Sequence, residues 1–216
     1  MFDKLRDVLL ASGDASSLEP VASRFVDDSR AQTNTNWQVT LLGSYASLLT
    51  RNGKPDQARP FAEEATKLCQ AQPPVKGDLW TASIALGALA DSLERLGETN
   101  QLEANALQLL NATRAQTSDT PAFARLLAEV TAIFRLHNKP SQARPLAEEA
   151  MAIFRRYPDR FEPWLQGLVF DNLIAILQAQ GSQAELESLS REQTAFQKKH
   201  TTEKEPVTTE QKSAER

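Results

Sequence analysis

Apolar side chains recur along the chain with the spacing of helices, whereas β-branched residues never alternate with polar ones over the length of a strand. Ala, Leu, Gln, Glu and Arg dominate the composition. The pattern therefore predicts an all-α protein. The predicted helices span residues 2–12, 17–31, 36–52, 57–71, 78–96, 101–115, 121–137, 142–156, 161–180 and 183–198.

One stretch of twelve residues occurs twice. KPDQARPFAEEA begins at Lys54 and KPSQARPLAEEA begins at Lys139, with ten of the twelve positions identical. A degraded copy lies midway, at 97–110, and two further copies follow from the same register, at 13–25 and 181–196. The chain is therefore predicted to be a repeat array.

Each repeat carries Gly or Asn where its first helix is predicted to end, because these residues tolerate the left-handed conformation that closes a helix. A second helix then begins near an N-capping residue, so each unit is a predicted helical hairpin. The predicted helix terminators are Gly13, Gly53, Gly97, Asn138 and Gly181, and the predicted N-caps are Ser17, Asp56, Asn100, Ser141 and Ser182.

The five hairpins are predicted to form one repeat domain over residues 1–197, because the linkers between them are too short to separate independent domains. Residues 198–216 have mixed charge and almost no apolar side chains, and we expect them to form a disordered tail. The predicted repeat units are 1–31, 36–71, 78–115, 121–156 and 161–197.

Small residues lie where two helices of a hairpin would cross closely, at Ala46, Ala90, Ala58 and Ala143. With the duplicated stretch, this pattern resembles the tetratricopeptide repeat, most closely its 42-residue variant in kinesin light chains. The second helix of that variant reads A-E-P-L-x-x-x-A-L, similar to QARPFAEEATKL and QARPLAEEAMAI. Its first helix ends N-N-L-A-x-L-x-x-x-G, similar to DNLIAILQAQG. The resemblance implies a right-handed α-solenoid whose concave face, lined by the first helices, receives a peptide or partner segment.

Large aromatic residues lie near the start of successive first helices, at Trp37, Trp80, Phe123 and Trp164. Large aromatic side chains most often serve as buried anchors, so we interpret them as packing each hairpin onto the one before. The alternative is an aromatic ladder that grips a ligand.

Helical spacing predicts which residues of the first helices face the groove. The predicted partner-binding residues are Ser47, Thr50, Arg51, Asp91, Glu94, Arg95, Arg135, Asp171, Asn172 and Gln178.

Arg51, Arg95 and Arg135 recur about once per repeat, which suggests an array that clamps acidic side chains or a carboxylate. The alternative is that they are ordinary surface arginines near helix C-termini. Asn172 matches the asparagine that often contacts peptide backbone in the resembling family. Its alternative role is a hydrogen bond between helices.

Charge and hydropathy exclude several classes of function. The net charge is -4, the sequence pI is about 5.4 and basic residues form no cluster, so we expect no nucleic-acid partner. No stretch is long enough to span a bilayer, and Asp3 and Asp7 interrupt the first apolar run, which excludes a signal peptide. The single cysteine, Cys69, excludes an intramolecular disulfide and fits a reducing compartment. We therefore expect a cytoplasmic protein that does not insert into membranes.

No catalytic motif is present. His137 and His200 belong to no nucleophilic or metal-binding arrangement, and no phosphate-binding glycine loop occurs. We therefore predict no enzyme activity, no catalytic residue, no metal site and no cofactor.

The sequence thus predicts a scaffold or adaptor, or an assembly factor, that binds a protein or peptide of unknown identity. A second hypothesis is a structural homo-oligomer that assembles through the end faces of the array. A third is a peptide or small-molecule sensor subunit, which we would expect to carry an output domain.

Overall fold

A computed structural model describes residues 19–31, 33–72, 79–115 and 119–202. In these residues the chain consists of α-helices, one short 3-10 helix and short turns, and it has no strand. The predicted helix 2–12, Gly13, Ser17 and residues 203–216 lie outside this part of the chain. The helices are α2 (Glu19–Arg30), α3 (Thr35–Arg51), α4 (Pro55–Ala71), α5 (Trp80–Leu96), α6 (Thr99–Arg114), α7 (Pro121–Leu136), α8 (Pro140–Arg156), the 3-10 helix η1 (Pro158–Arg160), α9 (Pro163–Ala179) and α10 (Gln183–Thr202).

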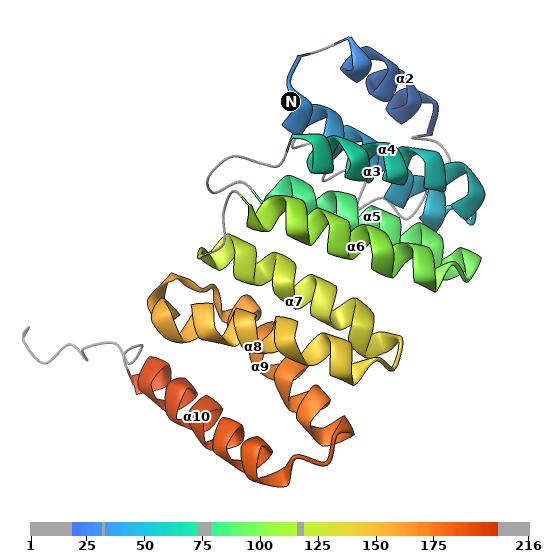
Figure 1. Ribbon diagram of the computed structural model, residues 1–216. Coiled ribbons are helices and arrows are strands. Elements are labelled where there is room, and N and C mark those ends of the chain that lie inside the picture. Colours follow the sequence, from blue (N-terminus) through green and yellow to red (C-terminus); the bar gives the residue numbers. More distant parts are fainter. Residues whose placement is uncertain (1–18, 32, 73–78, 116–118, 203–216) are drawn as a thin grey trace, which may run out of the picture.

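The helices stack as successive hairpins, α3 with α4, α5 with α6, α7 with α8 and α9 with α10, and α2 packs against α3 at one end (Figure 1). We call α3, α5, α7 and α9 the A helices and α2, α4, α6, α8 and α10 the B helices. Each A helix contacts the A helix of the next hairpin, and α4, α6 and α8 each contact the following A helix. This linear order of hairpins is the predicted α-solenoid.

Each A helix ends at a residue with positive φ: 74° at Gly53, 73° at Gly97, 57° at Asn138 and 68° at Gly181. The four predicted terminators within the described residues are therefore confirmed. The backbone N–H of the following residue donates to a carbonyl five residues back, as from Glu98 to Leu93 at 2.9 Å. This pattern closes a helix by a Schellman motif.

The turns are tighter than predicted. Helices α4 and α8 begin at Pro55 and Pro140, and α6 begins at Thr99, so the predicted N-caps Asp56, Asn100 and Ser141 lie inside their helices. A proline fits the first helical position because the N–H that it lacks would have no partner there. At the other end, α10 continues to Thr202, so residues 198–202 are helical and do not belong to a disordered tail.

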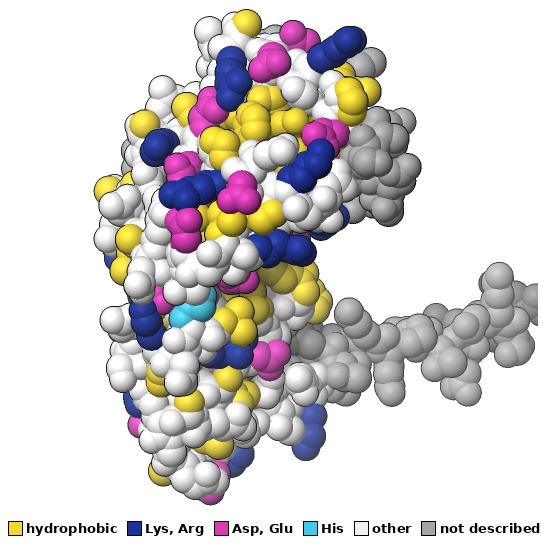
Figure 2. All heavy atoms as spheres, turned by 90° about the vertical axis from the view of Figure 1, so that its right-hand side faces the viewer, with side chains coloured by type: hydrophobic (Ala, Val, Ile, Leu, Met, Phe, Trp, Pro, Cys, Tyr) yellow, Lys and Arg dark blue, Asp and Glu magenta, His cyan; other side chains and the backbone are white. Residues whose placement is uncertain are grey.

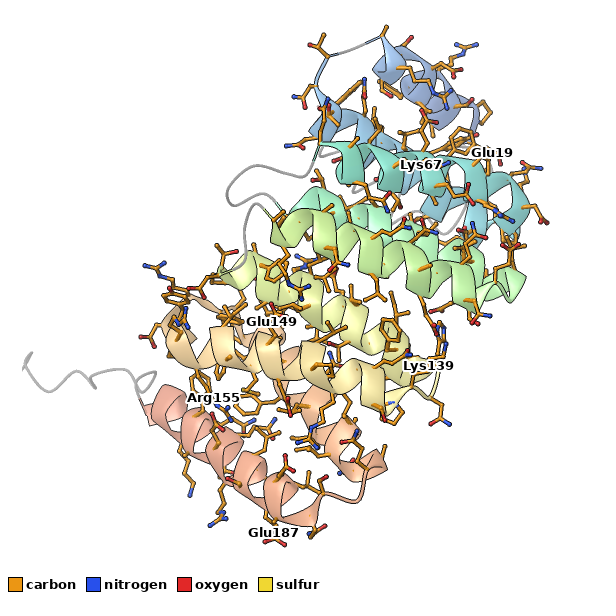
Figure 3. All side chains as sticks on the ribbon, viewed as in Figure 1. Glu19, Lys67, Lys139, Glu149, Arg155 and Glu187 are labelled. Carbon is orange, nitrogen blue, oxygen red and sulfur yellow. The ribbon has the colours of Figure 1, made fainter. Side chains whose placement is uncertain are left out.

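The duplicated stretch supplies side chains that link α4 and α8 to their neighbours. Lys54 pairs with Glu19 of α2, and Lys139 pairs with Glu103 of α6. Figure 3 labels Lys139 at the start of α8, with Glu149 and Arg155 along the same helix. The other pairs between B-helix regions of adjacent hairpins are Arg30–Glu64, Arg59–Glu98, Arg114–Glu149, Arg144–Glu185 and Arg155–Glu192.

These pairs explain why the stretch recurs after two hairpins and not after one. Helices α2 and α6 each carry a glutamate near the start and an arginine at the end, and both side chains pair with the next hairpin. Helices α4 and α8 carry the complementary glutamate, and the complementary lysine lies directly before each of them. Apart from Glu103, which is buried, the paired side chains are partly or fully exposed. Exposed pairs stabilise a fold little, but their signs favour one order of neighbours over another. The B helices are therefore of two alternating kinds.

Helix α10 closes the array. In α6, Ala106, Leu109, Leu110 and Thr113 are fully buried. The residues of α10 in the same register, counted from Gly97 and from Gly181, are Ser190, Gln193, Thr194 and Gln197. The positions that α6 buries are therefore polar in α10, as expected for a terminal repeat.

Candidate functional site

The A helices line the concave side of the stack. Figure 2 shows the molecule from its side, where a hollow opens opposite the B helices. The concave face has two parts. Aromatic side chains lie near the starts of the A helices, and charged side chains lie near their ends.

The aromatic residues of the A helices do not share one register. Counted back from the positive-φ residue of its hairpin, Phe123 lies two positions later in its helix than Trp80 and Trp164 lie in theirs. Two residues turn a helical side chain by about 200°. Phe123 is accordingly fully buried, while Trp80 is 43% exposed and Trp164 is 48% exposed. The prediction of a buried anchor is confirmed for Phe123, is wrong for Trp80 and Trp164, and holds in part for Trp37, which is partly buried against the core.

Arg125 of α7 lies between the two exposed indoles. Its guanidinium carbon is 4.5 Å from the Trp80 ring centroid and 4.9 Å from that of Trp164. Its Nε donates to Glu129 Oε1, one turn further along α7, at 2.9 Å. Cation–π contacts of this kind hold both rings and the guanidinium in place. We call Trp80, Arg125 and Trp164 the Trp–Arg–Trp ladder.

Sequence reasoning missed Arg125. Counted back from the terminator of each A helix, Arg125 of α7 occupies the position that Ile84 holds in α5 and Leu168 holds in α9. The same count places this position one turn after the two tryptophans, on the same face. Counting positions back from the terminators would therefore have predicted that Arg125 lies on the same face as Trp80 and Trp164.

Four predicted groove residues meet at the other end of the concave face, between α3 and α5. Partial desolvation raises the pKa of Asp91, and the charges of Arg51 and Arg95 and a hydrogen bond from Ser47 oppose that rise. The two arginines therefore face a carboxylate of the chain itself. Asp91 competes with any acidic partner for them.

Arg135 and Asn172 form a separate contact between α7 and α9. Asn172 is 2% exposed, and its Nδ2 donates to the Ala128 carbonyl at 2.9 Å. Arg135 Nε donates to Asn172 Oδ1 at 3.3 Å. Asn172 thus makes the helix-to-helix hydrogen bond given above as its alternative role. Arg135 is exposed and has no carboxylate partner among the described residues.

The remaining predicted residues differ in exposure. Thr50 is 1% exposed, and its hydroxyl donates to the Ala46 carbonyl at 3.0 Å, so the prediction that Thr50 faces the groove is wrong. Helix α3 packs against α2, α4 and α5, and Thr50 belongs to its buried side. Glu94, Asp171 and Gln178 are exposed.

The described residues hold no group of three His, Cys, Asp or Glu side chains placed to bind a metal ion. Over the same ranges, no helix combines the length and the apolar character that crossing a bilayer requires. Cys69 is a free, buried thiol, and burial raises its pKa to about 12. His137 lies against Glu103, which also binds Lys139, so this histidine belongs to a link between α6 and the α7–α8 turn.

No protein-family model matches the sequence, and no curated protein matches it. Solved structures match the fold. BtubC (BKLC) from P. vanneervenii superimposes with a TM-score of 0.70 at 18% identity, over 91% of this chain and 78% of that one. A Podosopora anserina chain, named for kinesin light chain and for its nearly identical TPR-like repeats, gives 0.65 at 16% identity, over 91% and 93%. A single-residue variant of that chain gives 0.66 at 17% identity, over 92% and 94%.

The fold is therefore a right-handed α-solenoid of tetratricopeptide-like (TPR-like) repeats, as the sequence predicted. This class of fold serves in general as a scaffold for protein interactions. At these identities the likeness concerns the fold alone.

Proposed function

We propose that this chain is a non-catalytic scaffold that binds a segment of a partner protein along its concave face. The observation that carries the proposal is the exposure of Trp80 and Trp164 on the same face of the stack. Tryptophan and arginine are the residues that most often dominate binding energy at protein interfaces. An exposed pair held in place by Arg125 loses little conformational entropy when a partner binds.

The charged part of the concave face supports a partner with acidic groups. Arg135 offers an exposed guanidinium that no described carboxylate neutralises. Its Nε contact with Asn172 fixes one edge of the guanidinium, so the other nitrogens are oriented for a carboxylate. Arg95 faces Asp91 and would contribute less.

An adaptor or assembly role in the cytoplasm fits these features. The buried free thiol of Cys69 fits a reducing compartment.

End-to-end self-association is the weaker hypothesis at the C-terminal end. The α10 surface that a following hairpin would cover carries Ser190, Thr194 and Gln197. Polar residues at these positions give an added hairpin little apolar area to bury. Nothing in the described part of α10 favours a filament built through this face.

The test is capture of partners from the native host by the full chain, followed by mass spectrometry. Arg95→Glu combined with Arg135→Glu should abolish capture of the specific partner, because both substitutions reverse charge on the concave face. Helicity and melting temperature should stay nearly unchanged, since both side chains are exposed.

A matched control changes the same amount of charge on the B helices. Arg24 of α2 and Lys67 of α4 are exposed, and Arg24→Glu with Lys67→Glu should leave capture intact. Equal capture by wild type and both double variants would overturn the proposed role of the concave face.

A further inference from the structure

We propose that the Trp–Arg–Trp ladder binds a proline-containing segment of the partner in the polyproline II conformation, with two prolines three residues apart. This inference rests on the proposed function and names the chemistry that the concave face recognises. Proline-rich segments dock onto exposed aromatic side chains because their backbone is already extended and loses little entropy on binding.

The upper limit on the distance between the two indoles is compatible with this conformation. Arg125 Cζ lies 4.5 Å and 4.9 Å from the two ring centroids, so the two centroids are at most about 9.4 Å apart. Three polyproline II residues advance about 9.3 Å, which lies within this limit, whereas two helical turns advance about 10.8 Å, which exceeds it. Two prolines at positions i and i+3 can therefore each contact one tryptophan.

Arg125 supplies hydrogen-bond donors between the two rings. Its Nε is engaged by Glu129, and its two Nη atoms make no hydrogen bond with any described residue. A polyproline II segment has no internal hydrogen bonds, so its carbonyls are free to accept. The residues between the two prolines can accept from Arg125 in this position.

Charge favours an uncharged segment over a strongly charged one at the ladder. The Glu129 carboxylate lies 2.9 Å from Arg125 Nε and compensates the charge of the guanidinium. Trp164 Nε1 donates to the Glu162 carboxylate, which places a second negative group at the edge of the site. These carboxylates repel an acidic segment here, and Arg125 repels a basic one.

Two glycines give independent support. Gly87 follows Trp80 by two helical turns, and Gly167 follows Trp164 by about one, so each lies on the same helix face as its tryptophan. A Cβ added at either glycine would meet nothing within 4 Å. Packing within the chain therefore does not require glycine there, although glycine weakens a helix relative to alanine. A bare helix backbone beside each indole lets an extended segment approach closely.

The experiment titrates the full chain with synthetic peptides of equal length and follows tryptophan fluorescence and calorimetric heat. One peptide carries Pro-x-x-Pro, the second has both prolines replaced by alanine, and two others are rich in Glu or in Lys. Only the proline peptide should bind with a shift in fluorescence. Trp80→Ala or Trp164→Ala should weaken it by about tenfold or more. Leu107→Ala, which removes another exposed apolar side chain, on the B helix α6, should not weaken it.

Gly87→Ala separates a binding role from a structural one. It should raise the melting temperature by about 2–4 °C and at the same time lower the affinity for the proline peptide. Equal binding of the proline and alanine peptides, or preference for the acidic or basic peptide, would overturn the assignment of the ligand. Partner capture that still depends on Arg95 and Arg135 in that case would leave the scaffold function standing. If the proline peptide is not preferred and partner capture also does not depend on Arg95 and Arg135, the scaffold function is removed as well.

Discussion

Ile84 of α5 fills the space next to Gly43 of α3, so that a Cβ on Gly43 would lie 2.6 Å from Ile84 Cγ2. Gly43→Ala therefore forces two A helices apart, and this cost outweighs the helix propensity that alanine adds. We expect the free energy of unfolding to fall by about 1–2 kcal/mol, measured by urea denaturation followed by circular dichroism.

Gly87→Ala is the matched control, because Gly43 and Gly87 hold the same position relative to the glycine that ends their helix. At Gly87 the new Cβ meets nothing within 4 Å. The same measurement should show a gain of about 0.5–1 kcal/mol. A loss at both positions would contradict the difference in packing between them.

Asn172→Ala tests whether this buried amide serves the fold. The substitution removes the buried hydrogen bond that Asn172 Nδ2 donates to the Ala128 carbonyl at 2.9 Å, and it removes the acceptor of Arg135 Nε. A typical intramolecular hydrogen bond contributes about 0.5–1.5 kcal/mol, so the melting temperature of the free protein should fall. The neighbouring Asp171 is exposed, and Asp171→Ala should change little. An unchanged melting temperature for Asn172→Ala would contradict the structural role of this residue and favour its predicted contact with a partner.

Glu103 should make stability depend on acid. Burial alone would raise the pKa of Glu103, but its hydrogen bonds with Lys139 and His137 and their charges outweigh burial and lower it from its ordinary value of 4.5. The folded state then binds this proton less readily than the unfolded state. The stabilisation is complete above the ordinary value and is lost as the pH falls through the lowered pKa.

Glu103→Gln should consequently reduce stability at neutral pH and flatten its decline as the pH falls below the ordinary pKa of 4.5, as measured by denaturation at a series of pH values. Lys139→Ala removes one cause of the lowered pKa and should act in the same direction. The idea fails if both variants keep the wild-type dependence on acid.

Cys69 should be inert in the native protein. Burial raises the pKa of its thiol to about 12, and the side chain is 2% exposed, so almost no thiolate is present or accessible at mildly alkaline pH. Iodoacetamide should leave the intact mass unchanged under native conditions and add one adduct in denaturant. Rapid alkylation of the folded protein would show that α4 opens readily.

The hairpins could be predicted from the sequence because their signals are local. The left-handed residue that ends each A helix is a glycine or an asparagine, at Gly53, Gly97, Asn138 and Gly181. The duplicated stretch marks the second helix. The N-caps Asp56 and Ser141 were misplaced because Pro55 and Pro140 start their helices directly after the turn, which shortens each connection, whereas Ser182 directly precedes α10 as predicted. Only the observed turn geometry shows this.

The ladder could be predicted only in part, because it depends on rotation about each helix axis. Trp37, Trp80 and Phe123 are evenly spaced along the chain, but equal spacing does not mean equal distance from the terminator. Thr50 and Asn172 were assigned to the groove by the same reasoning and are buried. Their surroundings come from neighbouring hairpins, which spacing within one helix does not describe.

Because the B helices alternate between two kinds, the number of hairpins removed from or added to the array decides whether its charge pairs are kept. If α5 and α6 and their turn were deleted in frame, α8 would follow α4, and Lys139 would meet Arg59, which holds in α4 the place of Glu103 in α6. A deletion or duplication of two hairpins keeps every lysine opposite a glutamate. A pair of hairpins is therefore the smallest unit whose removal or duplication preserves these charge pairs.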